Sequence, residues 1–469
     1  MPEPEVDDDA TVVVGGSWAA LVAAERLAAA GEPVHLLLPR RGVGGGFAPR
    51  RVDGRALELG LRVLELEHEA APASEDVPSL EQHDPAGAGH LPYLPLVSRY
   101  LADLAGDDLL ALPPSATAVG GRLTHDLFLT SDPAGVRDAL GAGDRRAAAA
   151  EVDPARPPGP LSGPGETRTL QQASLENHGR TVHEALIAPF VDKVAAGGAA
   201  AVLAAHRRRV WTPVLWPRSV WEACSDGPIG FRPRRPGATV RGGVGALVPR
   251  VLERIAVAGR IGVTTAGPLL ELGAAPDGRT RLTFEGGWQV LARRPVLAAP
   301  APELFAAAGV PYAPERVRTV VGWVEVAGEH VLAAPPVVHV VDPTIDALRI
   351  TTTVDPVGVP AGRRLLCVEL RHDLAEGRIA DAARDGLVRT GLVREGAPIQ
   401  LVDGVAARTF ALPTRATVDA FAAASRAFAD RELDVEVLGG GVALQGDYLN
   451  EQVVAGLACA ARRAGAVVG

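Results

Sequence analysis

One stretch near the start of the sequence constrains the fold more than any other part. Residues 12–39 read VVVGGSWAALVAAERLAAAGEPVHLLLP. The β-branched run Thr11–Val14 predicts a strand that is buried on both faces. The Ala- and Leu-rich segment that follows predicts a helix over about residues 18–30, which ends at Gly31. A second apolar run over 34–38 predicts another strand, so the stretch as a whole predicts a parallel β-α-β unit.

The turn between this first strand and the helix has the spacing of a dinucleotide fingerprint, G-x-G-x-x-G. In that fingerprint the first Gly makes the turn, the second lets the backbone approach a pyrophosphate, and the third lets helix pack on strand. Here the three positions hold Gly15, Ser17 and Ala20. Leu38 stands where an Asp or Glu would bind the adenosine ribose. The N–H groups at the start of the helix still favour a phosphate, so the scaffold is present without its ribose-binding acid.

Length and composition exclude several classes of protein. A chain of 469 residues is too long for one ordinary core, which predicts two or three domains. Its apolar fraction of 47% and charged fraction of 22% are typical of a globular protein. The net charge of −9 and the scattered arginines argue against a nucleic-acid interface. The acidic N-terminus, and the lack of an apolar run of membrane-spanning length, predict a cytoplasmic protein without a membrane span.

The cysteines and histidines show no metal-ligand spacing, so we predict no metal site. Cys224, Cys367 and Cys459 are far apart in the sequence and are predicted to be reduced thiols. His178 and His183 lack an acid or nucleophile partner, and we predict surface or interface positions for them. No catalytic triad, carboxylate pair or phosphate loop is evident. Any catalytic chemistry would therefore be that of a cofactor.

The remaining segments give a coarse outline of the chain. Residues 141–166 contain five prolines and predict a long surface loop. Helical patterns cover about 171–206 and 415–430. A glycine turn leads into an amphipathic helix over 241–256, and 319–371 alternates as strands do.

These segments, in this order, resemble the flavin-dependent amine oxidase and protoporphyrinogen oxidase superfamily, and more closely its UDP-galactopyranose mutase-like branch. The likeness covers nearly the whole chain. It is carried by the β-α-β start and by five further segments: Val43-Gly44-Gly45, Glu58-Leu59-Gly60, residues 176–198, GGVGAL at 242–247 and QGDYLNEQVVAG at 445–456. One departure is that Gly441 is followed by Val442, where the mutase pattern has an arginine.

The resemblance implies an α/β fold in which a Rossmann-like FAD-binding domain, of the GR2-type flavoprotein fold, is interleaved with an α+β substrate domain. The implied FAD-binding domain consists of 1–66, 235–300 and 432–469. The implied substrate domain consists of 67–234 and 301–431.

The resemblance also implies the residues of the site. FAD, bound non-covalently, would contact Gly15, Gly16, Ser17, Trp18, Ala19, Leu38, Arg40, Arg41, Gly44, Gly45, Gly60, Leu61, Arg62, Gly446 and Asp447. Asp447 would bind the ribityl chain or lie near the pyrophosphate, and its alternative is an ordinary turn acid before a helix. Arg218, flanked by Trp216 and Trp221, and Arg349 fall in segments that line the substrate cleft of the mutase-like branch.

Two hypotheses of function follow. The first is an FAD-dependent oxidoreductase that acts on a small polar biosynthetic intermediate or a sugar nucleotide. Within it, Arg40 and Arg41 leave NADPH open as an alternative cofactor, since an arginine after the second strand can accept a 2′-phosphate. The second is a flavin-fold protein that has lost its cofactor and serves as a non-redox enzyme or as the partner subunit of an intact paralogue. A homodimer and a heteromer with a related flavoprotein are both compatible with these hypotheses.

Overall fold

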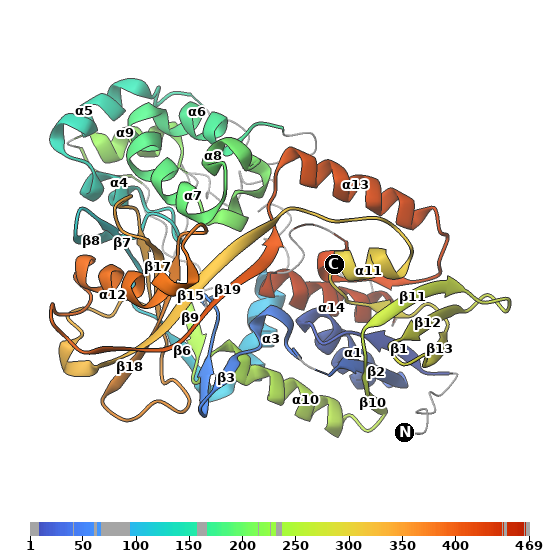
Figure 1. The fold of residues 1–469 in the computed structure, drawn as a ribbon. Helices are drawn as coiled ribbons and strands as arrows, with labels where there is room; N and C mark the ends of the chain where they lie inside the picture. Colours follow the sequence, from blue (N-terminus) through green and yellow to red (C-terminus); the bar gives the residue numbers. More distant parts are fainter. Residues whose placement is uncertain are drawn as a thin grey trace.

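Two sheets organise the chain, one of five parallel strands and one of seven mostly antiparallel strands. The computed structural model describes residues 9–40, 42–60, 63–66, 94–156, 167–213, 215–225, 227–230, 237–442, 444, 448–463 and 465. In Figure 1 the parallel sheet and its helices lie at the lower right, the seven-stranded sheet lies at the left, and a group of helices covers the top left.

The five-stranded sheet has the order β10-β2-β1-β14-β20, and all its strands are parallel. Its strands are β1 (Thr11–Val14), β2 (Val34–Pro39), β10 (Ile261–Ala266), β14 (Val296–Leu297) and β20 (Glu436–Val437). Helix α1 (Trp18–Ala29) connects β1 to β2 and shares one apolar core with α3 (Leu94–Ala105), α10 (Leu247–Val257) and α14 (Leu449–Arg463). The predicted β-α-β unit is confirmed, because its valines and leucines are buried on both sides of the sheet.

Smaller elements surround this sheet. An antiparallel sheet of β11 (Leu269–Ala274), β12 (Thr280–Phe284) and β13 (Gln289–Ala292) joins β10 to β14. Helices α11 (Ala301–Ala307) and α13 (Arg415–Ala429) pack on the same side of the molecule. The remaining short strands are β3 (Arg50–Val52), β4 (Arg55–Leu57), β5 (Leu64–Glu65), β6 (Leu109–Ala111) and β9 (Gly237–Val240).

The seven-stranded sheet has the order β19-β15-β18-β17-β16-β7-β8. Its strands are β7 (Ala116–Val119), β8 (Arg122–His125), β15 (Arg316–Ala327), β16 (Val337–Val340), β17 (Ala347–Thr352), β18 (Arg363–Leu370) and β19 (Ile399–Ala411). Neighbouring strands are antiparallel except for β16 and β7. One face packs on α12 (Ile379–Arg389), and the other faces the parallel-sheet half and the helical group.

The helical group has its own apolar core. Its helices are α4 (Pro133–Ala139), α5 (Ala142–Glu151), α6 (Leu170–Val182), α7 (Ala188–Val194), α8 (Gly198–Ala201) and α9 (Pro217–Cys224). Helix α6 is broken at Gly179, which has a φ of 79°, and the chain continues through a π-helical turn over His183–Ile187.

Four expectations need correction or comment. The segment predicted as a loop from residue 141 begins with α5, because four successive alanines are strong helix formers and the prolines start only at Pro154. His178 and His183 were predicted at surface or interface positions but are buried, and the ring of His178 lies within hydrogen-bonding distance of Ser174 and accepts from the N–H of Leu215. The three cysteines are free and buried. The domain boundaries stay predictions, although α3, assigned to the substrate domain, packs on the parallel-sheet half.

Candidate cofactor and substrate site

The glycine turn at the end of β1 is tightly enclosed. Gly15 has a φ of 133°, and a Cβ there would lie 2.8 Å from the carbonyl oxygen of Ala298 at the end of β14. A Cβ on Gly16 would lie 2.8 Å from ring carbons of Pro39. Both positions therefore require glycine, the first for its backbone conformation and the second for space.

Ser17, which replaces the second fingerprint glycine, is the N-cap residue of α1. Its hydroxyl accepts from the backbone N–H of Ala20 at 3.5 Å and donates to the carbonyl of Ala298 at 3.4 Å. The side chain thus turns back toward the protein and satisfies one of the N–H groups at the helix start.

A second N–H group at the start of α1 is bound by a side chain from the far end of the sequence. The backbone N–H of Trp18 donates to Oε1 of Gln452, on α14, at 3.0 Å. Both residues are buried. One turn further along α14, a Cβ on Gly456 would come within 2.9 Å of backbone atoms of α1, so the two helices are in close contact.

The segment after β2 lies against the glycine turn. The N–H of Gly44 donates to the carbonyl of Gly16 at 2.6 Å. A Cβ on Gly45 would lie 3.6 Å from Cα of Ser17. Gly44 and Gly45 have φ values of 97° and 60°. The structure therefore brings together four predicted cofactor residues: Gly16, Ser17, Gly44 and Gly45.

The residues at the glycine turn fit a phosphate group, and the end of β2 does not fit a ribose. Among the described residues, no group accepts a hydrogen bond from the N–H of Ala19, which is buried at the start of α1. An unpaired N–H there is suited to an anion. Leu38, by contrast, lies in the apolar core, and Arg40 is exposed and pairs with Glu285 at 3.3 Å. Neither side chain supplies the acceptor that a ribose needs.

Five predicted site residues lie outside the described part of the chain. They are Arg41, Leu61, Arg62, Gly446 and Asp447.

A row of buried polar side chains crosses the seven-stranded sheet where it faces the parallel-sheet half. His339 on β16, Arg349 on β17 and Glu369 on β18 are cross-strand neighbours. Arg349 is only 1% exposed and forms an ion pair with Glu369 through Nη2. Its guanidinium carbon lies 3.8 Å from the ring centroid of Trp211. Nε and Nη1 of Arg349 have no hydrogen-bond partner among the described residues.

Gly60 connects this row to the parallel-sheet half. A Cβ on Gly60 would lie 3.2 Å from Nη2 of Arg349 and would collide with the carboxylate of Glu369. Gly60 was predicted as a cofactor residue and Arg349 as a substrate residue, so the structure brings one member of each set together. Nearby, the indole N–H of Trp323 donates to the carbonyl of Glu58 at 2.7 Å and ties the two halves together.

His339 packs against two aromatic rings, with its ring centroid 5.4 Å from that of Phe128 and 5.6 Å from that of Phe190. Its Nδ1 lies 3.6 Å from a carboxylate oxygen of Asp126. Burial lowers the pKa of His339, although the facing carboxylate opposes that shift. Burial would raise the pKa of Asp126, but His339 and the backbone N–H groups of residues 129 and 130 hold it below its ordinary value. A neutral imidazole beside a carboxylate is therefore expected at pH 7.

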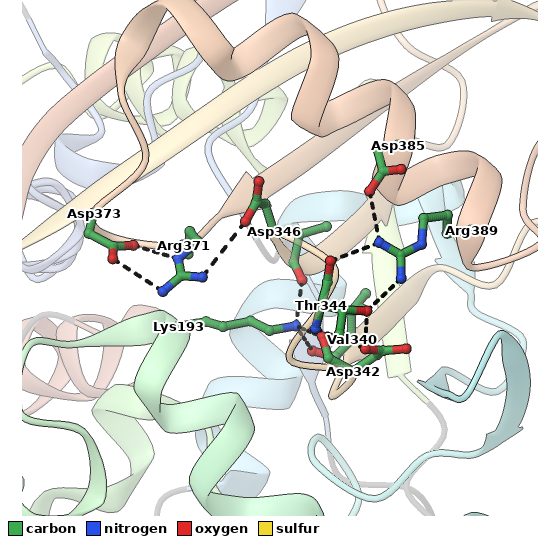
Figure 2. A network of polar contacts seen from close by, with 10 residues as sticks. Lys193, Val340, Asp342, Thr344, Asp346, Arg371, Asp373, Asp385 and Arg389 are labelled. Atoms are coloured by element: carbon green, nitrogen blue, oxygen red, sulfur yellow. Dashed lines mark hydrogen bonds and ion pairs between the residues drawn. The ribbon is translucent and has the colours of Figure 1, made fainter.

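The loop between β16 and β17, which leads from His339 to Arg349, is held by Lys193 (Figure 2). Lys193 is the only lysine of the sequence and is buried. Its ammonium donates to the carbonyl oxygens of Val340 at 2.9 Å, Asp342 at 2.6 Å and Ala347 at 3.0 Å. Burial lowers the pKa of Lys193 to about 7. This clamp fixes both ends of the loop between the two strands.

Arg218, the other predicted substrate residue, lies on α9 with its side chain exposed. It pairs with Glu222 at 3.0 Å, one helical turn away. No described contact joins Arg218 to Arg349, so its role stays a prediction. Trp221 beside it is 40% exposed, and Trp216 is partly buried.

Several residues of this region were not predicted as site residues. Gln452 contacts the glycine turn, Trp211 stacks on Arg349, and Glu369 pairs with it. Arg209 lies 5.2 Å from the ring centroid of Tyr448, which precedes α14. The alternation of residues along the strands is the one sequence signal that bears on whether Arg349 shares a sheet face with His339 or Glu369. It is not sufficient, because the pairing of the strands must also be known.

Among the described residues, no group of three or more His, Cys, Asp or Glu side chains is arranged to hold a metal ion. No helix in the same part of the chain combines the length and apolar character needed to cross a membrane.

Comparisons with known proteins agree with this architecture. Residues 13–76 match a family model described as an NAD(P)-binding Rossmann-like domain. The structure is similar to that of reduced UDP-galactopyranose mutase, with a TM-score of 0.72 and 16% identity over 98% of this chain and 94% of that chain. It is also similar to a putrescine oxidase double mutant, with a TM-score of 0.56 and 16% identity over 97% and 98% of the two chains. No curated protein sequence matches.

A third solved structure, a CLA-producing fatty acid isomerase from P. acnes, has a TM-score of 0.55 and 12% identity over 98% of this chain and 99% of that chain. Identities this low show the fold alone. The predicted resemblance and the predicted α/β flavoprotein fold class are confirmed at that level. The chain therefore carries a Rossmann-like dinucleotide-binding domain within the fold of UDP-galactopyranose mutase and putrescine oxidase.

Proposed function

We propose that this protein is an FAD-dependent oxidoreductase that acts on a small anionic molecule, such as a sugar nucleotide or an acidic biosynthetic intermediate. The observation that carries the proposal is the position of Arg349. Its guanidinium is buried next to Gly60, at the contact between the dinucleotide-binding half and the seven-stranded sheet.

A ligand would account for the unpaired atoms of Arg349. A guanidinium stays charged at every physiological pH, and leaving its N–H groups buried without acceptors is costly. Glu369 takes one edge of the group, while Nε and Nη1 have no acceptor among the described residues. A carboxylate or phosphate can accept from two such N–H groups at once. An anionic substrate fits this arrangement better than a cationic amine does.

The cofactor is proposed on the other side of Gly60. The N–H of Ala19 and the glycines at 15, 16, 44 and 45 would hold its pyrophosphate. A bound flavin would supply hydride or electron-pair transfer, and the protein would orient the substrate and exclude water. Within this proposal the neutral ring of His339, held beside Asp126, is a hydrogen-bonding group for the substrate.

The test combines cofactor and substrate binding. We expect the purified protein to bind FAD, with a visible flavin spectrum and a rise in melting temperature, because a ligand of the folded state stabilises it. Arg349→Lys should weaken binding of a probe such as UDP-galactose without unfolding the chain, since an ammonium does not match a planar fork. The same change at Arg218 tests the second predicted substrate residue. A colourless protein that ignores FAD, or unchanged probe affinity in Arg349→Lys, would contradict the proposal.

A second candidate is favoured by the burial of Leu38 in the apolar core. It is a flavin-fold protein without a cofactor, acting as a non-redox enzyme or as the partner subunit of an intact paralogue. Mass spectrometry of small molecules released on denaturation separates the two, because only the first should release FAD.

A further inference from the structure

We propose that Trp211 is a positioning residue for the anionic substrate: its indole lies on the guanidinium of Arg349, fixes the plane of that group and excludes water from one of its faces. The proposal deepens the proposed function, and it rests on that function only for the role of Arg349 in binding an anion. Its basis is the contact between the two side chains and the backbone conformation that Trp211 adopts to make it.

The contact is a close cation–π pair around a buried charge. The guanidinium carbon of Arg349 lies 3.8 Å from the centroid of the Trp211 ring, and Arg349 is 1% exposed. A cation–π contact gains strength when the cation is removed from water. The N–H groups of a guanidinium all lie in its plane, so a ring stacked on its face fixes the directions in which they donate.

The ion pair of Arg349 does not supply this restraint alone. Glu369 pairs with Nη2, while Nε and Nη1 have no hydrogen-bond partner among the described residues. A pair formed through one nitrogen leaves the plane free to turn about that contact. The indole removes this freedom, so the remaining donors of Arg349 are already oriented when an anion arrives.

The backbone of Trp211 shows that the position of the indole is imposed by its surroundings. Its φ is 50°, in the left-handed region that a bulky side chain rarely adopts. Six described residues other than glycine have a positive φ, and Trp211 is the aromatic one among them. Strain of this kind persists only where the surrounding contacts outweigh it, and it gathers at functional sites.

The turn is held on both sides of Trp211. Val210 is fully buried in the core of the helical group. The N–H and the hydroxyl of Thr212 donate to the carbonyl of Arg207, each at 3.3 Å, and the guanidinium of Arg207 donates to the carbonyl of Thr212 at 3.3 Å. Phe410, on β19, meets the indole edge-on with 6.2 Å between the ring centroids. The helical group and the sheet thus hold the indole in place together.

Three substitutions of Trp211 separate the ring from the turn. Trp211→Phe keeps an aromatic face and should bind UDP-galactose and inorganic pyrophosphate within about threefold of the wild type. Trp211→Leu keeps apolar bulk without a π face and should weaken binding by about five- to thirtyfold, the range for a desolvated cation–π contact. Trp211→Asn suits the left-handed backbone but should weaken binding equally, because the loss follows the ring. If Trp211→Leu does not fold, the comparison of Trp211→Asn with Trp211→Phe carries the test.

A double-mutant cycle with Arg349→Lys supplies a readout that a structural role would not move. An ammonium has no plane for the indole to fix, so Trp211→Leu in the Arg349→Lys background should weaken binding by at most about twofold more. A tryptophan that only supports the fold would weaken binding by the same factor in both backgrounds. The control is Trp288→Leu, which removes a partly buried indole from its stack on Phe284 and should lower the melting temperature without changing anion affinity.

The outcomes separate this inference from the proposed function. Anion binding that needs both Trp211 and Arg349, in a protein that ignores FAD, supports the inference and removes the FAD-dependent enzyme. Binding that Arg349→Lys weakens and Trp211→Leu does not, or wild-type affinity in Trp211→Asn, overturns the inference and keeps Arg349 as the anion ligand. FAD binding without any binding of either anion that depends on Arg349 overturns the inference and keeps the flavoprotein.

Discussion

Leu38 is the residue at which the dinucleotide fingerprint departs most from its pattern, and it packs in the core that α1 shares with α10. Replacing it by Glu should have two separate effects. Without ligand, the buried carboxylate should lower the free energy of unfolding by about 1–3 kcal/mol, through lost apolar burial and desolvation. With FAD bound, the carboxylate can accept from the ribose hydroxyls and should tighten binding on the order of ten- to a hundredfold.

Titrating FAD into Leu38→Glu while recording melting temperatures measures both effects. Leu38→Met, which keeps the volume and the apolar character, is the control and should leave FAD affinity unchanged. A destabilised Leu38→Glu variant that is still indifferent to FAD would mean that no ribose lies at the end of β2.

At the scale of elements, the loop between β16 and β17 depends on Lys193. Its pKa is lowered by burial to about 7, below the ordinary value of 10.5. The native state therefore binds fewer protons than the unfolded chain between about pH 7 and 10, and stability should rise with pH across that window. The slope can reach about 1.4 kcal/mol per pH unit for one proton. Lys193→Met removes the titrating group and should abolish this part of the pH dependence.

Urea unfolding of both proteins from pH 6 to pH 10 checks this prediction. The charged groups that act on Lys193 are Asp342, Asp346, Arg371 and Arg389. They remain in the variant, so only the contribution of Lys193 differs between the two profiles. Parallel profiles would show that the three carbonyl oxygens keep the ammonium charged throughout.

The elements differed in how far the sequence alone could predict them. The β-α-β unit was predicted almost to the residue, because its period and its glycines are local signals. Helix α5 was not predicted, because the five prolines of residues 141–166 indicated a loop for the whole segment. Its first ten residues contain no proline. The burial of His178 could not be predicted either. Its ring accepts from the N–H of Leu215, 37 residues further along the chain, and no local pattern shows that contact.

The contacts of the candidate site could not be predicted from the sequence for a different reason. Arg349 could be predicted as a cleft residue from the resemblance, but its pairing with Glu369 depends on the register of β17 against β18. The bond between Trp18 and Gln452 joins residues 434 positions apart. No local pattern encodes either contact, because both arise only when elements distant in sequence have packed.

At the scale of the whole molecule, the two halves meet where the indole N–H of Trp323 donates to the carbonyl of Glu58. The carboxylate of Glu58 in turn accepts from the N–H of Gly245 at 2.9 Å, just before α10. Glu58 thus links the seven-stranded sheet to the dinucleotide-binding half, two residues before Gly60. A cofactor and a substrate on either side of Gly60 would both depend on this link.

Trp323→Phe keeps an aromatic ring at the contact and removes the N–H donor together with part of the indole's buried volume. We expect the free energy of unfolding to fall by about 1–2 kcal/mol more than in the control variant, the cost of losing one buried hydrogen bond. If the two halves of the variant still unfold as one unit, differential scanning calorimetry should show a single peak at lower temperature. If this hydrogen bond is what couples the unfolding of the two halves, the peak should split in two. Trp288→Phe, at a ring that stacks on Phe284 at 4.9 Å, is the matched control. A Trp323→Phe peak that coincides with the wild-type peak would mean that apolar packing alone joins the halves, and Gly60 would then be held against Arg349 without help from Glu58.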